Sequence, residues 1–214
     1  MSRLPGLKTY CNNSNLEYNY SSMRGKWFIG WIFTFPLLKI LTGVEIYGSI
    51  PKHGAYIVAC NHVSHLDPPV VGITACREVY FLAKAGLFKL SRFFTWLIKT
   101  CNALNVYSTE GMKQAIRLLK KGRTVVIFPE GTRSRVGKML PFNPGVAYLS
   151  ISLGVPVIPV YISNSTKGFV SLMLRINKLK IKFGKPIYPS GYKKDEGDFA
   201  KFAEKIRQEV EKLK

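Results

Sequence analysis

The sequence predicts a single α/β domain, in which helices flank a mixed, mostly parallel sheet, with an N-terminal apolar helical segment that lies at a membrane surface. Short apolar runs typical of buried strands alternate with segments of helical periodicity, which is the pattern of an α/β domain. A chain of 214 residues is long enough for one complete core and too short for two large ones. We therefore expect one sheet with helices on its faces.

The apolar runs predict strands over 55–60, 79–83, 124–128 and 155–162. Helical periodicity predicts helices over 86–104, 109–121 and 198–213, the last of them amphipathic. The segment 178–183 alternates lysines with apolar residues, which indicates an extended segment with one solvated face. The prolines within 155–162 predict an edge strand or an irregular one.

The N-terminal region divides into two parts. Residues 1–22 are rich in Asn, Ser and Tyr and lack the apolar core of a signal peptide, so we expect a poorly ordered leader. Residues 23–43 contain an uncharged run over 27–38, only 12 residues long, which is short of the roughly 20 needed to cross a bilayer. Its tryptophans and phenylalanines, with basic residues at both ends, favour an interfacial membrane anchor over the alternative of a core helix. Pro36 is expected to bend or break it.

The charge of the chain restricts its partners. Lysine and arginine number 32 against 12 acidic residues, a net charge of +20, which is typical of proteins with polyanionic partners. The aromatic residues cluster in apolar segments rather than among the lysines, and no nucleic-acid-binding module is recognisable, so an anionic membrane or phosphorylated small molecules are favoured over nucleic acid. Four cysteines without a CxxC spacing indicate reduced thiols rather than a disulfide framework.

Two polar residues follow the strand over 55–60, where α/β sheets bind ligands. His62 is a candidate general base, and Asp67 could hold one ring nitrogen while the other takes a proton from a hydroxyl. Five residues span about 140° of a helix, so the two can meet only if the chain turns between them. Pro68 marks Asp67 as the N-cap of a following helix, after such a turn.

Other interpretations of these residues stay open at this point. Asp67 could serve only as a cap, and His62 could be a buried structural histidine. His65 is a rival base, or a metal ligand together with His62, although no cluster of Cys, Asp or Glu completes a zinc site.

A second polar segment, FPEGTRS, follows the strand over 124–128 and should therefore lie beside the His62 loop. Gly131 allows backbone N–H groups to approach an anion, and Thr132 adds a hydroxyl donor. Arg133 offers a planar fork that matches phosphate oxygens. A polar surface turn is the alternative for this segment alone.

Together these segments resemble the glycerolipid acyltransferases, the family that includes the 1-acylglycerol-3-phosphate acyltransferases. NHVSHLD resembles the family's NHxxxxD motif, and FPEGTRS is similar to its acceptor-phosphate motif. VPVIPV resembles its fourth block, and LAKAGLF the opening of its second. The blocks occur in family order from about residue 27 to the end, with the acyltransferase domain over 44–214.

The resemblance implies roles for particular residues. His62 would deprotonate the acceptor hydroxyl, with Asp67 orienting it, and the oxygen would attack an acyl thioester. The residues implied for acceptor binding are Glu130, Gly131, Thr132 and Arg133, with Arg133 on the phosphate and Lys84 as a further contact.

The resemblance also implies the partners. The reaction would convert 1-acylglycerol-3-phosphate to phosphatidate, with acyl-CoA or acyl-carrier protein as donor and neither metal nor tightly bound cofactor. The lysophospholipid acceptor and an anionic membrane would be partners, at the cytoplasmic face of the cell membrane, with monotopic or peripheral attachment.

The sequence departs from the family pattern at two places. The second block usually ends in an acidic residue and an arginine, whereas residues 105–108 read NVYS. Basic residues usually precede the glycine that corresponds to Gly145, which here follows FNP. Both departures remove positive charge where the acceptor phosphate is expected. A lysolipid with another headgroup is therefore an alternative acceptor, and a non-catalytic lipid-binding membrane protein is the alternative function.

Overall fold

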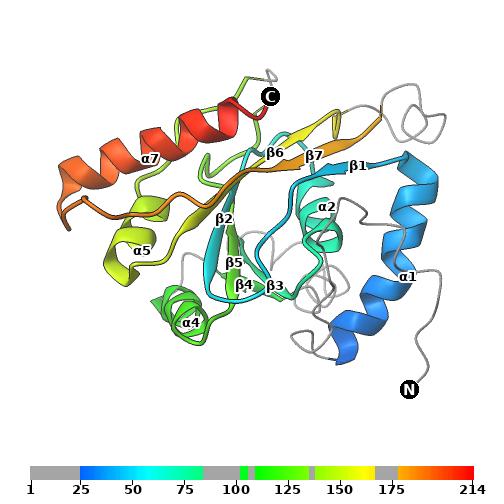
Figure 1. Ribbon diagram of the computed structural model, residues 1–214, viewed down its shortest axis with the longest axis horizontal. Coiled ribbons are helices and arrows are strands. Elements are labelled where there is room, and N and C mark those ends of the chain that lie inside the picture. The colour runs from blue at the N-terminus through cyan, green and yellow to red at the C-terminus, as the bar shows by residue number, and fades with distance from the viewer. Residues whose placement is uncertain (1–24, 84–101, 106–108, 135–137, 167–177) are drawn as a thin grey trace.

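A computed structural model describes residues 25–83, 102–105, 109–134, 138–166 and 178–214. Its centre is a seven-stranded sheet with the order β1-β7-β6-β2-β5-β3-β4 (Figure 1). The strands are β1 (Glu45–Tyr47), β2 (Tyr56–Cys60), β3 (Val79–Ala83), β4 (Ala103–Asn105), β5 (Thr124–Ile127), β6 (Val157–Ser163) and β7 (Lys180–Phe183). Neighbouring strands are parallel except for β6 and β7, which are antiparallel. The prediction of a mixed, mostly parallel sheet is confirmed.

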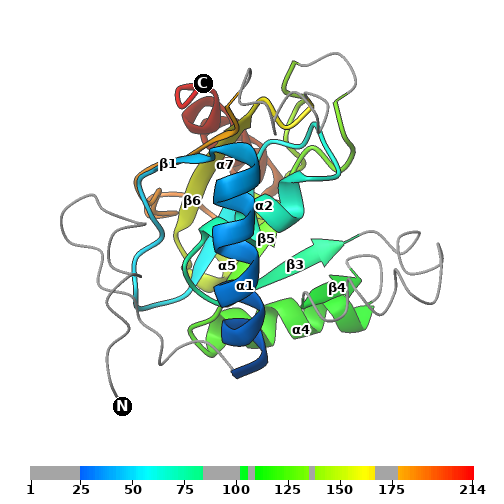
Figure 2. The same ribbon diagram turned by 90° about the vertical axis from the view of Figure 1, so that its right-hand side faces the viewer.

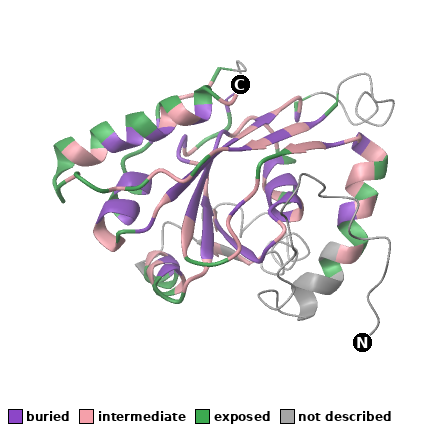
Figure 3. Cartoon of the chain, viewed as in Figure 1, coloured by how far each residue is buried: buried purple, intermediate pink, exposed green. Residues whose placement is uncertain are grey.

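Helices cover both faces of the sheet, as Figures 1 and 2 show. One face carries α1 (Gly25–Thr42) and α2 (Asp67–Thr74), and the other carries α4 (Thr109–Lys120), α5 (Gly145–Leu153) and α7 (Glu196–Glu211). Because the central strands are covered on both faces, nearly all their residues are buried (Figure 3). Two apolar cores result, one on each side of the sheet.

The closing helix matches its prediction apart from its ends. Asp195 caps α7, because its carboxylate accepts a hydrogen bond of 2.8 Å from the Asp198 N–H. Phe202, Ile206 and Val210 recur at intervals of four and are fully buried against the sheet. The helix predicted over 109–121 is likewise confirmed as α4.

The prediction that the proline-containing strand lies at an edge is wrong, because β6 lies inside the sheet, between β2 and β7. In a strand, the N–H and C=O of one residue point to the same side. The Pro159 carbonyl accepts a hydrogen bond of 2.8 Å from the Gly184 N–H, one residue beyond the end of β7. The missing N–H of Pro159 faces the same side, between the regular β6–β7 ladder, which ends at the pair of Val160 and Phe183, and the bridge that joins Val157 to Ile187.

Helix α1 runs unbroken through Pro36, so the expected break does not occur. Phe35 is buried, and Leu38 packs against the core on the α2 side of the sheet. Phe33, Leu37 and Ile40 instead face outward and are 72%, 55% and 67% exposed. Packing on one side holds the helix together, while its outer face stays apolar. Among the described helices, none combines the length and the apolar character needed to cross a membrane.

Two further predictions concern segments that lie wholly or mostly outside the described residues. The leader over 1–22 and most of the helix predicted over 86–104 lie outside them. The end of that predicted helix is the strand β4 instead, which pairs in parallel with β3. Helix α5, which the sequence patterns did not single out, is apolar on nearly all sides and is largely buried, so it lacks the amphipathic periodicity of a surface helix.

Candidate active site

The two polar segments lie side by side at one edge of the sheet. The loop over 61–66 leaves the carboxyl end of β2, and the loop over 128–134 leaves the carboxyl end of its parallel neighbour β5. The Ser134 N–H donates a hydrogen bond of 2.8 Å to the His62 carbonyl. The expectation that parallel strands bring these segments together is confirmed.

The imidazole of His62 is paired with the carboxylate of Asp67. Their Nδ1 and Oδ2 atoms lie 2.9 Å apart, and Asp67 is completely buried. The same Oδ2 accepts backbone hydrogen bonds of 2.8 Å from Val63 and 2.7 Å from Ser64. With Nδ1–H donated to a buried carboxylate, Nε2 is the nitrogen free to accept a proton.

Asp67 is not the N-cap of α2, contrary to the prediction. It is the first residue of the helix, Leu66 occupies the cap position, and no side chain caps the helix end. The carboxylate turns back instead and closes the turn over 62–66. The prediction of a turn that brings Asp67 to His62 is nevertheless confirmed.

Phe128 lies against the His62 ring. The two ring centroids are 4.4 Å apart with an angle of 30° between the planes. The side chain of His62 keeps 19% of its surface exposed, so the ring is supported on one side and accessible on another. His65, the rival base, is exposed in the turn before α2. Within the described ranges, no group of three or more His, Cys, Asp and Glu residues could hold a metal ion.

Asn61 fixes the end of β2 immediately before His62. Its Nδ2 donates to the Ile162 carbonyl at 3.0 Å, and its Oδ1 accepts from the Ile162 N–H at 2.7 Å. This side chain thus joins the end of β2 to β6 just beyond the last regular pair of the two strands, Cys60 and Val160. Asn61 was not predicted as a site residue. The signal available in the sequence was an amide side chain at the end of an apolar strand, next to a candidate base.

Glu130 is buried beside His62. Its Oε1 accepts a hydrogen bond of 2.7 Å from the His62 N–H, and its Oε2 accepts one of 2.9 Å from the Leu140 N–H. Burial raises the pKa of this carboxyl, whereas the two backbone N–H groups act in the opposite direction.

Gly131 occupies a conformation that favours glycine. Its φ of +66° lies in the left-handed region, and a Cβ would come within 2.9 Å of Asn143 Nδ2. That amide donates a hydrogen bond of 2.9 Å to the Pro129 carbonyl. A side chain at position 131 would therefore strain the backbone and disturb this bond.

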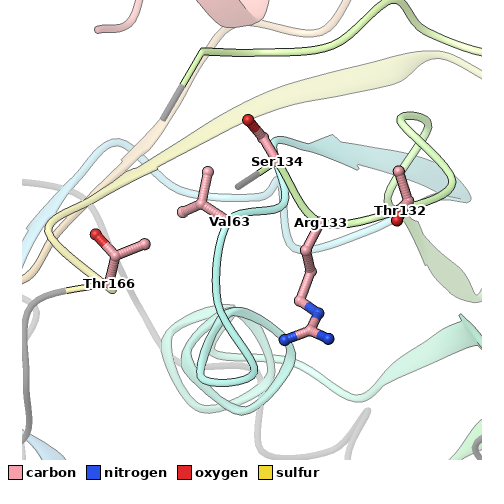
Figure 4. A pocket seen from close by; sticks show the side chains of 5 residues that line it. All are labelled: Val63, Thr132, Arg133, Ser134 and Thr166. Atoms are coloured by element: carbon pink, nitrogen blue, oxygen red, sulfur yellow. The ribbon is translucent and has the colours of Figure 1, made fainter. Parts of the chain in front are cut away.

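A pocket of about 270 Å³ opens beside the His62 loop. It is lined by Val63, Thr132, Arg133, Ser134 and Thr166 (Figure 4). Arg133 is exposed, and its guanidinium extends away from the backbone of the loop. Thr132 and Arg133 were predicted from the sequence. Val63 was not, although it lies in the His62 loop, because its side chain has no polar group, and Thr166 was not, because it comes from a distant segment. Lys84 lies outside the described residues.

Comparison with known proteins gives a consistent result. A family model described as Acyltransferase matches residues 43–163, more than half of the chain. A 1-acyl-sn-glycerol-3-phosphate acyltransferase of Borreliella burgdorferi is 30% identical over 136 residues, which cover 61% of this chain and 53% of that protein. A protein of the same name from Bacillus subtilis is 24% identical over 163 residues, covering 73% of this chain and 79% of that protein.

A solved structure is similar over most of the chain. The crystal structure of the 1-acyl-sn-glycerophosphate acyltransferase PlsC from Thermotoga maritima matches with a TM-score of 0.65 and 27% identity, covering 89% of this chain and 83% of that one. The chain spans only about half the length of the Borreliella burgdorferi relative, 53%, and 60% of a relative from Limnanthes douglasii.

Proposed function

Since the chain belongs to the acyltransferase family, as its motifs indicated, we propose that it transfers a fatty acyl group to the sn-2 hydroxyl of 1-acylglycerol-3-phosphate and so forms phosphatidate. The observation that carries this proposal is the His62–Asp67 pair, 2.9 Å apart, beside a pocket that contains Arg133. Relatives that carry the name of this activity support the choice of acceptor.

In the proposed mechanism, Nε2 of His62 takes the proton of the acceptor hydroxyl as its oxygen attacks the thioester carbonyl. The C–S bond then breaks, the ester remains on the acceptor, and the proton on His62 passes to the departing thiolate. Asp67 keeps Nδ1 protonated and stabilises the imidazolium that forms between these steps. Its position is suited to this role because backbone N–H groups from Val63 and Ser64 hold the same oxygen.

We assign the acceptor phosphate to the pocket beside His62. The guanidinium of Arg133 can form two parallel, charge-assisted hydrogen bonds with phosphate oxygens. Thr132 lines the same pocket and can add a hydroxyl donor, while Gly131 provides the turn that presents both side chains. A volume of about 270 Å³ suits a glycerol phosphate headgroup rather than a long acyl chain. Lys84 remains a proposed further contact.

The proposed donor is acyl-CoA or acyl-carrier protein, and no tightly bound cofactor or metal is required by the mechanism. Both donors carry the acyl group on a thiol attached to a phosphorylated handle. The net charge of +20 favours either one electrostatically.

We also propose that the protein acts at the cytoplasmic face of the cell membrane, attached as a monotopic or peripheral protein. The outward apolar face of α1, with Phe33, Leu37 and Ile40, supports this location, and Lys39 lies on the same helix. An apolar helix face with nearby basic residues is the usual arrangement of an interfacial anchor on anionic lipid.

A lysolipid with a different headgroup is the second candidate acceptor, favoured by the missing arginine in residues 105–108. Mass spectrometry of the products from a panel of lysolipids, each with acyl-CoA and with acyl-carrier protein, distinguishes the candidates. We expect lysophosphatidate to be converted fastest. Preference for a lysolipid without a terminal phosphate would overturn the acceptor assignment but not acyl transfer. Transfer to no lysolipid would favour a non-catalytic lipid-binding protein.

A further inference from the structure

We propose that Glu130 is a positioning residue that holds the backbone of His62 in place, rather than a residue that contacts the acceptor. This inference rests on the proposed function of His62 as general base. It differs from what the sequence motif implied, which was a direct part in acceptor binding.

Both carboxylate oxygens of Glu130 already have backbone partners. Oε1 accepts from the His62 N–H at 2.7 Å, and Oε2 accepts from the Leu140 N–H at 2.9 Å. The residue is only 6% exposed. A negative carboxylate would also repel the phosphate of the acceptor, because like charges in a site of low dielectric raise each other's energy. The geometry and the charge therefore both point away from acceptor contact.

The loop over 128–134 holds His62 from three sides. Glu130 accepts from the His62 N–H, the Ser134 N–H donates to the His62 carbonyl at 2.8 Å, and the Phe128 ring lies 4.4 Å from the imidazole. Asp67 fixes only Nδ1. Together with Asn61 and Asp67, this loop therefore sets the place of the ring, and Glu130 is its only charged contact with the His62 backbone among the residues described.

Glu130 also ties the loop to the segment before α5. Besides the bond from Leu140, Asn143 donates to the Pro129 carbonyl through both its backbone N–H and its Nδ2, each at 2.9 Å. Arg133 lies next to Ser134 on the same loop. The loop over 128–134 therefore positions both His62 and Arg133. A shift of this loop should alter the geometry of the reacting groups more than it alters the binding of the substrate.

The substitution Glu130→Gln tests this arrangement. The two N–H groups bond to different oxygens of Glu130, and a glutamine has an NH2 group in place of one of these oxygens, so its amide would oppose one of the two N–H groups. We expect kcat to fall about 10- to 100-fold, as for misplacement of a catalytic group by roughly 1 Å, with little change in the KM of acceptor or donor. Asn143→Ala should produce a smaller loss in the same direction, because it removes one of the two bonds to Pro129.

Glu78→Gln is the matched control. Glu78 is 4% exposed, accepts a hydrogen bond from Asn102 and lies 3.7 Å from Arg123. It immediately precedes β3, at the edge of the sheet opposite to the His62 loop. Both glutamine variants should lower Tm, but only Glu130→Gln should lower kcat per folded molecule.

A measurement made without substrate tests the positioning role of Glu130 independently of the proposed function. The chain has three histidines, so ¹⁵N-histidine NMR can follow each imidazole. In Glu130→Gln and Asn143→Ala, the His62 signals should shift, while those of His53 and His65 stay in place. Unchanged His62 signals with a raised acceptor KM would mean that Glu130 contacts the acceptor. Unchanged signals with a loss of Tm alone, as in Glu78→Gln, would reduce its role to stability. Failure of the wild type to acylate any lysolipid would overturn the proposed function and leave the NMR result valid.

Discussion

His62 Nδ1 and Asp67 Oδ2 lie 2.9 Å apart although five positions separate the two residues in the chain. The turn that joins them is closed by the carboxylate itself, which accepts from the Val63 and Ser64 N–H groups. The oxygen that orients the imidazole is therefore held by the backbone between the two residues. This arrangement keeps the proton on Nδ1 and leaves Nε2 as the basic nitrogen.

Replacing the proposed base should abolish most of the activity. His62→Ala should lower kcat by about 10²- to 10⁴-fold, the usual contribution of a general base, with folding intact. His65→Ala is the control, because His65 is exposed in the turn before α2 and should matter much less. Steady-state kinetics and circular dichroism check both variants. Equal turnover of wild type and His62→Ala would show that His62 is not the base.

Removing the charge of the orienting carboxylate should slow the reaction without changing the tautomer of His62. In Asp67→Asn, the amide oxygen can take the place of Oδ2 and still accept from Val63, Ser64 and His62 Nδ1, because one oxygen accepts all three bonds. The negative charge that would stabilise the imidazolium is then lost, while the Nδ1–H form of His62 is kept. We expect kcat to fall about 10- to 100-fold with nearly unchanged KM values, since a hydrogen bond to a charged group contributes about 1.5 to 3 kcal/mol. ¹⁵N-histidine NMR should show the Nδ1–H form in the variant, and a change of tautomer would contradict this explanation.

The guanidinium of Arg133 should contribute to binding of the acceptor and not to binding of the acyl donor. Arg133→Lys should raise KM for the lysolipid several-fold and leave KM for the acyl donor nearly unchanged, since a lost charge-assisted hydrogen bond costs about 1.5 to 3 kcal/mol. Arg117→Lys, on the exposed side of α4, is the matched control. An equal effect on both substrates would indicate that Arg133 does not bind the acceptor phosphate.

The outer face of α1 should determine membrane binding. Substituting Phe33, Leu37 and Ile40 together by serine should release the protein from anionic vesicles in a cosedimentation assay. High salt should weaken the binding of the unchanged chain, because it screens the attraction between basic residues and lipid. Tyr148→Ser and Tyr188→Ser, at other exposed positions, serve as controls. Full binding by the triple variant would show that the outer face of α1 is not the membrane contact.

Glu45 should make stability depend on acid pH. Hydrogen bonds from Lys178 first, then from Tyr47 and Lys180, lower the pKa of this carboxyl from 4.5 to about 2 in the folded protein. The resulting stabilisation is complete above pH 4.5 and is lost as the pH falls toward 2, because the unfolded chain takes up the proton first. The Tm difference between wild type and Glu45→Gln should therefore shrink over this range. A difference that stays constant would assign the effect of Glu45 to something other than its charge.

The sequence by itself determined the type of most secondary elements and the identity of the two central motifs. Buried strands such as β2 and β5 are short apolar runs, and α7 shows the spacing of Phe202, Ile206 and Val210 along one face. These signals are local, because each depends on residues a few positions apart. Each motif directly follows a strand, and this was enough to predict that the loops after β2 and β5 lie at one edge of the sheet.

Only the tertiary structure decided which groups satisfy one another across long distances in the chain. One partner of the Glu130 carboxylate is the His62 N–H, 68 positions away, and Asn61 bonds to Ile162, 101 positions away. The interior place of β6 and the unbroken course of α1 through Pro36 likewise depend on neighbours that no local pattern specifies. Apolar periodicity indicates that a segment is buried. A hydrogen bond between distant segments depends instead on the strand order and on the course of the loops, which the local pattern does not contain.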